Sequence, residues 1–164
     1  MTTNEALDFL RQHQPMPADD KLSQDLIDRY DEVRKFFLSK KDARCVPLFL
    51  NSFGYIDGHG VYQLVEDVIT QFSPEEVVPH LEIALHNPEY SVRYWCAQIA
   101  SVFPSDKLLP KLQLILEFDD FDLKYAALTA LEQFEKYQSK PIIEGFLQKE
   151  SDEELIDLAK NILS

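Results

Sequence analysis

Residues 73–103, SPEEVVPHLEIALHNPEYSVRYWCAQIASVF, and residues 104–134, PSDKLLPKLQLILEFDDFDLKYAALTALEQF, carry the same residue pattern twice. Tyr94 and Tyr125 occupy equivalent positions, and most apolar positions repeat with the same spacing of about thirty-one residues. A period of this size is typical of helical hairpins that cannot each bury an apolar face alone and therefore stack on one another. The sequence predicts an all-α fold built from stacked hairpins.

The pattern extends in both directions from this central pair of repeats. Upstream, a first repeat begins near Ala43, breaks at the glycine-rich residues 54–60, and resumes with an expected helix over residues 61–72. Downstream, a weaker fourth repeat keeps Pro141 and ends in an apolar helical pattern over residues 155–163. Terminal repeats are usually atypical because one of their faces meets water.

Helix starts can be predicted from capping residues. Ser73 and Glu76 have the spacing of a capping box, in which each side chain accepts a hydrogen bond from the backbone N–H of the other residue. We expect Ser91 and Asp122 to cap the second helices of the two central repeats, and a further capping box over residues 151–154.

The N-terminal quarter lies outside the repeat pattern. Residues 4–13 predict a short amphipathic helix, residues 14–20 contain two prolines and predict a loop, and Ser23 is a suitable N-cap for a longer second helix. We therefore expect one domain of 164 residues, with two N-terminal helices in residues 1–42 and the repeats in residues 43–164.

Charge is distributed unevenly along the chain. The formal net charge is −13, and residues 45–92 contain seven acidic residues without a single lysine or arginine. A nucleic-acid-binding surface needs clustered basic residues, so this composition disfavours nucleic acid as a partner. A basic protein partner is the natural complement of such a field, and solubility alone is the alternative explanation.

The sequence offers no cofactor or metal site. Cys45 and Cys96 lie within apolar helical patterns and are expected to be small buried hydrophobic residues. Asp57 and His59 lie close together in the glycine-rich break, but two ligands fall short of the three or four that zinc requires. We expect that segment to be a turn.

The sequence contains neither a membrane span nor a secretion signal. No apolar run approaches the eighteen or so residues needed to cross a bilayer, and Met1 to Glu5 lack the basic and apolar regions of a signal peptide. The expected compartment is the cytoplasm, with no membrane partner.

The repeats are similar to a known family. They resemble bacterial short HEAT repeats, the type also seen in phycobilin lyases, over residues 43–164. The resemblance rests on PEEVVPHL (74–81), LHNP (85–88), SVRYWCA (91–97), LLPKL (108–112) and DLKYAALTAL (122–131). It implies an α-solenoid of about four HEAT-like hairpins, preceded here by the two N-terminal helices.

Proteins with such repeats include scaffolds, bilin lyases, DNA glycosylases and immunity proteins of bacterial toxin systems, and the fold does not choose among them. The adjacent acids Asp119 and Asp120 predict a polar turn, not a catalytic pair, and no other catalytic arrangement is present. Our hypothesis is a non-enzymatic protein-binding module, in its sharpest form an acidic cytosolic immunity protein or antitoxin that neutralises a basic toxin domain. The alternatives are a HEAT-repeat enzyme of the lyase or glycosylase type and a structural subunit of a larger assembly.

Partner-binding residues are predicted on the second helix of each repeat, because these helices line the concave face of a stacked-repeat protein. Tyr94 and Tyr125 could form an aromatic pair there, or could pack between repeats. The predicted partner-binding residues are Tyr62, Glu66, Asp67, Arg93, Tyr94, Gln98, Lys124, Tyr125, Thr129 and Glu132.

Overall fold

The computed structural model describes residues 1–164 as an all-α protein without strands. None of its helices combines the length and the apolar character needed to cross a membrane. The α-helices are α1 (Thr3–Arg11), α2 (Gln24–Ser39), α3 (Cys45–Leu50), α4 (Val65–Ile69), α5 (Pro74–Ala84), α6 (Tyr90–Ala100), α7 (Leu109–Ile115), α8 (Phe121–Leu131), α9 (Lys136–Leu147) and α10 (Glu153–Leu163). Three short 3₁₀ helices accompany them: η1 (Asp19–Lys21), η2 (Tyr62–Leu64) and η3 (Asp106–Leu108).

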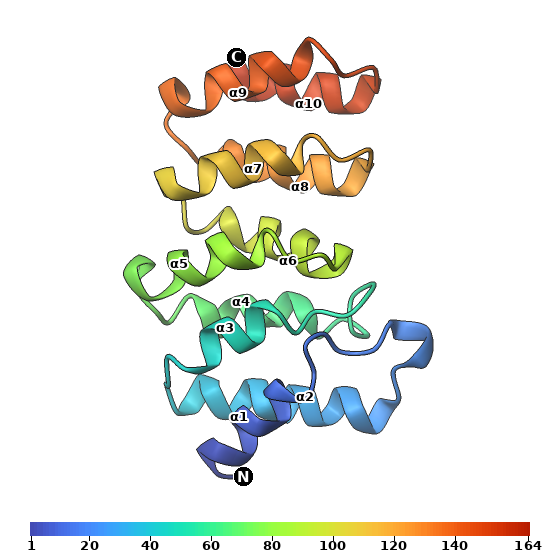
Figure 1. Ribbon diagram of the computed structural model, residues 1–164, viewed down its shortest axis with the longest axis vertical. Coiled ribbons are helices and arrows are strands. Elements are labelled where there is room, and N and C mark those ends of the chain that lie inside the picture. The colour runs from blue at the N-terminus through green and yellow to red at the C-terminus, as the bar shows by residue number, and fades with distance from the viewer.

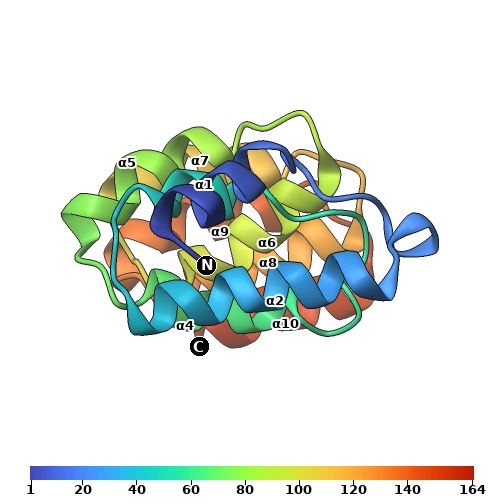
Figure 2. The same ribbon diagram turned by 90° about the horizontal axis from the view of Figure 1, so that it is seen from below.

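Consecutive helices form pairs that lie one above another along the long axis of the molecule (Figure 1). Viewed along that axis, the odd-numbered helices lie on one side and the even-numbered helices on the other (Figure 2). Helix α1 packs on α3 and α3 on α5, while α6 packs on α8 and α8 on α10. The α1–α2 pair forms one end of the molecule and covers neither side of the other pairs (Figure 1).

One hydrophobic core runs through all of these pairs. Forty-six buried residues, from Ala6 in α1 to Ile162 in α10, form a single cluster. Phe72, Phe103 and Phe134, which occupy equivalent positions in three hairpins, all belong to it. Burial of a phenylalanine side chain contributes roughly 1.5 to 3 kcal/mol, so these rings help to hold each hairpin to its neighbour. Cys45 and Cys96 are free and buried, as the apolar pattern predicts.

Two of the predicted caps are confirmed. Ser73 and Glu76 form the capping box at the start of α5, where the Glu76 carboxylate accepts a hydrogen bond from the Ser73 backbone N–H at 3.0 Å. Ser23 caps α2 by accepting from the backbone N–H of Leu26 at 3.2 Å.

The predicted caps of the second helices are wrong. Helix α6 begins at Tyr90, and Ser91 lies inside it as a buried residue whose hydroxyl donates to the Phe53 carbonyl oxygen at 2.7 Å. Asp120 caps α8, because its extended backbone directs the carboxylate to the Leu123 N–H, 2.8 Å away.

The last capping residue is also shifted. Asp152, not Ser151, caps α10 by accepting from the Leu155 N–H at 3.0 Å. A neighbouring carboxylate thus replaces the predicted cap at α8 and α10, whereas at α6 the Ser91 hydroxyl is engaged in a tertiary contact.

The glycine-rich break forms the expected turn, and a second loop holds it in place. The Asp19 carboxylate accepts hydrogen bonds from the backbone N–H groups of Gly58 at 3.0 Å and Asp57 at 3.3 Å. The backbone of Gly54 passes so close to this loop that an added Cβ would lie 2.5 Å from the Met16 carbonyl oxygen. Residues 54–60 are therefore fixed against the N-terminal segment, beside the start of α6.

Candidate functional site

Two adjoining pockets lie beside α6. They have volumes of about 400 and 290 Å³ and share Gln63, Tyr94 and Trp95. We call the two pockets together the α6 groove. The larger is also lined by Tyr55, Ile56, Asp57, Tyr90, Ser91 and Asp122, and the smaller also by Tyr62, Glu66, Gln98 and Ile99.

Aromatic rings form much of the wall of the larger pocket. Tyr90 and Tyr94, one helical turn apart on α6, stack with a 9° angle between ring planes and 6.3 Å between centroids. Tyr55 from the glycine-rich turn packs on Tyr90 at 5.9 Å, and Trp95 meets Tyr94 edge-on at 5.3 Å. Such rings present electron-rich faces, to which cations are attracted.

Trp95 connects α6 to the turn. Its indole N–H donates to the Ile56 carbonyl oxygen at 3.0 Å, and its side chain is partly buried against the hydrophobic core. Ile56 has a φ of +83°, which is strained for a β-branched residue, and 56% of its surface is exposed. The turn thus holds an apolar side chain at the rim of the pocket in a costly conformation.

Carboxylates line both pockets without basic partners. Asp57 and Asp122 line the larger pocket and Glu66 the smaller, and none of them forms an ion pair within the chain. Partial burial, followed by repulsion from Asp67, raises the pKa of Glu66 above its ordinary value. The ionised carboxylate of Glu66 would therefore gain from a nearby cation.

Asp120, in contrast, is already engaged. It accepts hydrogen bonds from the Tyr90 hydroxyl at 3.3 Å and from the Leu123 N–H at 2.8 Å. Burial raises the pKa of the Tyr90 hydroxyl, and the nearby Asp120 and Asp122 raise it further, so this phenol stays a hydrogen-bond donor. Asp120 thereby fixes the Tyr90 ring and is not a free ligand.

No lysine or arginine lines either pocket. Aromatic faces and unpaired carboxylates in one concave surface are suited to a cationic side chain, which can stack on a ring and bond to a carboxylate at once.

The chain matches no protein-family model, no curated protein and no solved structure.

Five of the predicted binding residues lie at or beside the groove. Tyr62, Glu66, Tyr94 and Gln98 line it, and the Gln98 side-chain amide donates to the Tyr94 hydroxyl at 3.1 Å. Asp67 is exposed on α4, next to Glu66.

Tyr62 is not an outward-facing residue as predicted. Its side chain is 1% exposed and packs against Tyr30, Phe53 and Trp95. Burial raises the pKa of its hydroxyl to about 12, and the hydroxyl oxygen has no hydrogen-bond partner. The predicted outward orientation is wrong because Tyr62 lies in the 3₁₀ helix η2, where three residues per turn replace the α-helical spacing.

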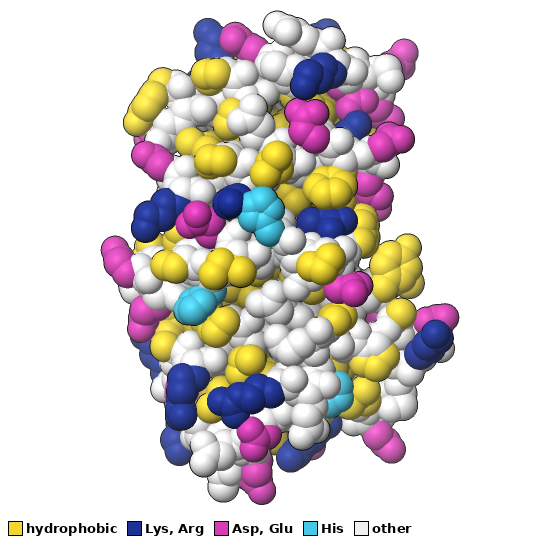
Figure 3. Space-filling view, in the orientation of Figure 1, with side chains coloured by type: hydrophobic (Ala, Val, Ile, Leu, Met, Phe, Trp, Pro, Cys, Tyr) yellow, Lys and Arg dark blue, Asp and Glu magenta, His cyan; other side chains and the backbone are white.

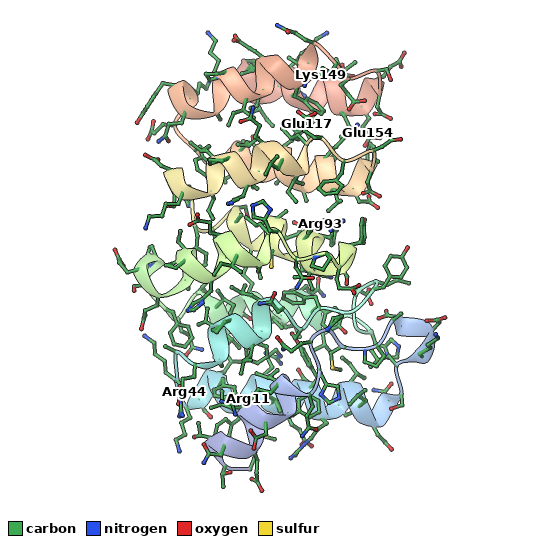
Figure 4. The ribbon with its side chains drawn as sticks, in the orientation of Figure 1. Arg11, Arg44, Arg93, Glu117, Lys149 and Glu154 are labelled. Atoms are coloured by element: carbon green, nitrogen blue, oxygen red, sulfur yellow. The ribbon has the colours of Figure 1, made fainter.

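Arg93 and Lys124, which share a repeat position, line other pockets and brace neighbouring hairpins. Arg93 donates to the carbonyl oxygens of Asn87 and Pro88 at 3.0 and 2.9 Å, and its guanidinium lies 4.4 Å from the centroid of the Phe118 ring. Figure 4 shows Arg93 between the α5–α6 and α7–α8 pairs. Lys124 forms a 2.7 Å ion pair with Glu150.

The predicted residues of α8 lie outside the two pockets. Tyr125 is 40% exposed and packs on Phe121 of the same helix, with 5.8 Å between ring centroids. Tyr94 likewise packs on Tyr90 within α6, so each tyrosine pairs inside its own helix and not with the other. The Thr129 hydroxyl donates to the Tyr125 carbonyl oxygen at 2.9 Å, and Glu132 is exposed just after α8.

Several groove residues were missed by sequence reasoning: Tyr55, Ile56, Asp57, Tyr90, Trp95 and Asp122. One signal was available, because the Tyr90–Tyr94 spacing recurs one period later as Phe121–Tyr125. The turn residues carry no comparable signal, since the N-terminal loop sets their position.

The opposite side of the molecule, formed by the odd-numbered helices, is different in character. Figure 3 shows hydrophobic side chains over α5 and α7, with basic and acidic side chains interspersed. Ile83 and Leu114, one period apart, are 71% and 50% exposed there. A pocket between these helices contains one carboxylate, Glu117, which is paired with Lys149.

Proposed function

We propose that this protein is a protein-binding module of stacked HEAT-like repeats, an α-solenoid, whose α6 groove binds a basic segment of a protein partner. The observation that carries the proposal is the wall of tyrosine and tryptophan rings beside the unpaired carboxylates of Asp57, Asp122 and Glu66. A basic segment would supply the missing cations and bury part of the aromatic surface.

In its sharpest form, the proposal is an acidic immunity protein or antitoxin of the bacterial cytosol that neutralises a basic toxin domain. Its support is the net charge of −13 and the absence of lysine and arginine from residues 45–92, which supply Asp57, Glu66 and the Tyr55 and Tyr90 rings of the aromatic wall. A field of one sign accelerates encounter with an oppositely charged protein.

Affinity capture from a lysate of the source cells tests this function when it is performed with matched variants. One variant carries Asp57→Asn, Asp122→Asn and Glu66→Gln. The control carries the same loss of charge at the exposed Glu153, Glu154 and Asp157 of α10.

We expect the wild type and the control to retain a basic protein that the groove variant loses. The antitoxin form further requires that this protein be toxic when expressed alone and harmless when co-expressed with the wild type. If the variant with Asp57→Asn, Asp122→Asn and Glu66→Gln captures a protein as well as the wild type does, the proposal is contradicted. This holds whether the captured protein is a substrate or a subunit of an assembly.

A further inference from the structure

The larger pocket of the α6 groove combines aromatic rings with the carboxylates of Asp57 and Asp122. We propose that it binds an arginine of the partner, in preference to lysine; this inference rests on the proposed function and specifies its ligand.

The aromatic wall is held rigid by hydrogen bonds. The Tyr90 hydroxyl donates to Asp120, the Tyr94 hydroxyl accepts from Gln98, and the Trp95 indole donates to the turn. Rings fixed before binding lose little conformational entropy on binding, so their contact with a ligand is retained as affinity.

The two carboxylates of the pocket come from different segments. Asp57 belongs to the glycine-rich turn, where one of its oxygens accepts from the Gly60 N–H at 3.1 Å, and this bond orients the carboxylate. Asp122 belongs to the first turn of α8 and has no partner in the chain. A guanidinium has five donors in one plane, so it can lie on a ring face while its edges reach separate acceptors.

The chain itself contains an arginine site built in this way. The Arg93 guanidinium lies over the Phe118 ring at 4.4 Å while donating to two carbonyl oxygens. The larger pocket offers tyrosine faces in place of Phe118 and charged carboxylates in place of the carbonyls. Lysine would fit less well, because its ammonium is more strongly hydrated and does not stack on a ring as a planar group.

Trp95 is the only tryptophan of the chain, so its indole N–H resonance is assigned without ambiguity, and the bond of this N–H to Ile56 places it at the larger pocket. The probes are acetyl-Gly-Arg-Gly-amide, the same peptide with lysine, and the same peptide with citrulline, which keeps the shape of arginine without its charge. Each is titrated at millimolar concentrations into ¹⁵N-labelled protein.

We expect the arginine peptide to shift the Trp95 resonance and to bind about threefold or more tightly than the lysine peptide. The citrulline peptide should have little effect. Combined Asp57→Asn and Asp122→Asn should remove the shift, whereas Glu153→Gln with Asp157→Asn should leave it unchanged.

An unmoved Trp95 resonance, or equal binding of the arginine and lysine peptides, would overturn the inference. If capture of the partner still depends on the groove acids in that case, only the arginine preference fails. If capture does not depend on them, the proposed function fails as well.

Discussion

The indole N–H of Trp95 donates a hydrogen bond to the carbonyl oxygen of Ile56, 3.0 Å away and 39 residues earlier in the chain. This bond fastens the glycine-rich turn to α6 and so joins two of the walls of the larger pocket. It also holds Ile56 in a left-handed conformation that β-branched residues rarely adopt. The α6 groove thus depends on a tertiary contact as well as on the repeat.

Replacing Trp95 with phenylalanine keeps an aromatic ring and removes the donor. Because one hydrogen bond is lost and the side chain is only partly buried, we expect the free energy of unfolding to fall by about 1 kcal/mol. Urea denaturation measures the change. A loss above about 3 kcal/mol would instead indicate a core position.

Ile56→Gly separates the stability of the turn from its binding role. Glycine adopts a φ of +83° without steric cost but loses more backbone entropy on folding, so these effects oppose one another. We expect the free energy of unfolding to stay unchanged or to rise by up to about 1 kcal/mol, while affinity for the partner falls because an exposed apolar contact is removed. Clear destabilisation would contradict the strain described for this residue.

The Lys124–Glu150 ion pair should contribute to stability, because both side chains are largely buried. Their exposed fractions are 16% and 7%, and Glu150 also accepts from the backbone N–H groups of Ser151 and Asp152. We expect Lys124→Met to cost about 1 to 3 kcal/mol. The matched control is Lys149→Met, which breaks the exposed pair with Glu117 and should cost less than about 0.5 kcal/mol. Figure 4 shows Lys149 and Glu117 near each other on adjacent pairs of helices.

This ion pair also predicts a pH dependence. The hydrogen bond from Lys124 is the main cause that lowers the pKa of Glu150, and backbone donors lower it further. The stabilisation is therefore complete above the unfolded pKa of about 4.3 and is lost as the pH falls through the lower folded value. Thermal melts should show the difference between wild type and Lys124→Met shrinking in that acidic range. A constant difference would contradict the assignment.

Glu66 has the opposite dependence, because its folded pKa is raised. The free energy of unfolding therefore falls as the pH rises above the unfolded pKa of about 4.3. The whole loss is present once the pH exceeds the higher folded pKa, where Glu66 is ionised in both states. We expect Glu66→Gln to raise the melting temperature at neutral pH by about 1 to 2 °C, since solvent screens a partly exposed group. No gain is expected at pH 3, where both states are protonated. Equal gains at both pH values would assign the effect to packing.

The periodic positions account for the part of the fold that the sequence predicts. Phe72, Phe103 and Phe134 recur at one spacing and are all buried, because a repeated apolar position meets the same environment in each hairpin. Cap positions fail where tertiary structure competes: the hydroxyl of Ser91 bonds to the buried Phe53 carbonyl oxygen and cannot cap a helix.

The groove was only partly predictable. Tyr94 and Glu66 follow from the position of their helices in the repeat, whereas Tyr62 falls in a 3₁₀ helix and turns inward. Tyr55 and Ile56 reach the pocket only because the Asp19 carboxylate, in the N-terminal loop, holds the glycine-rich turn in place. These two segments have no periodic relation in the sequence, so the contact between them cannot be predicted from the repeat.

The rate of association with the captured basic partner tests the central claim most directly. Surface plasmon resonance measures this rate at about 0.1 M and about 1 M salt. The Debye length falls from about 10 Å to about 3 Å between these concentrations, so salt screens long-range attraction. We predict that salt slows association of the wild type, and that Asp57→Asn, Asp122→Asn and Glu66→Gln together slow it at low salt and flatten its salt dependence. Tyr94→Ala should act mainly on dissociation, as expected of an anchor residue. If the matched changes at Glu153, Glu154 and Asp157 slow association equally, the acids of the α6 groove are not the docking site and the account is contradicted.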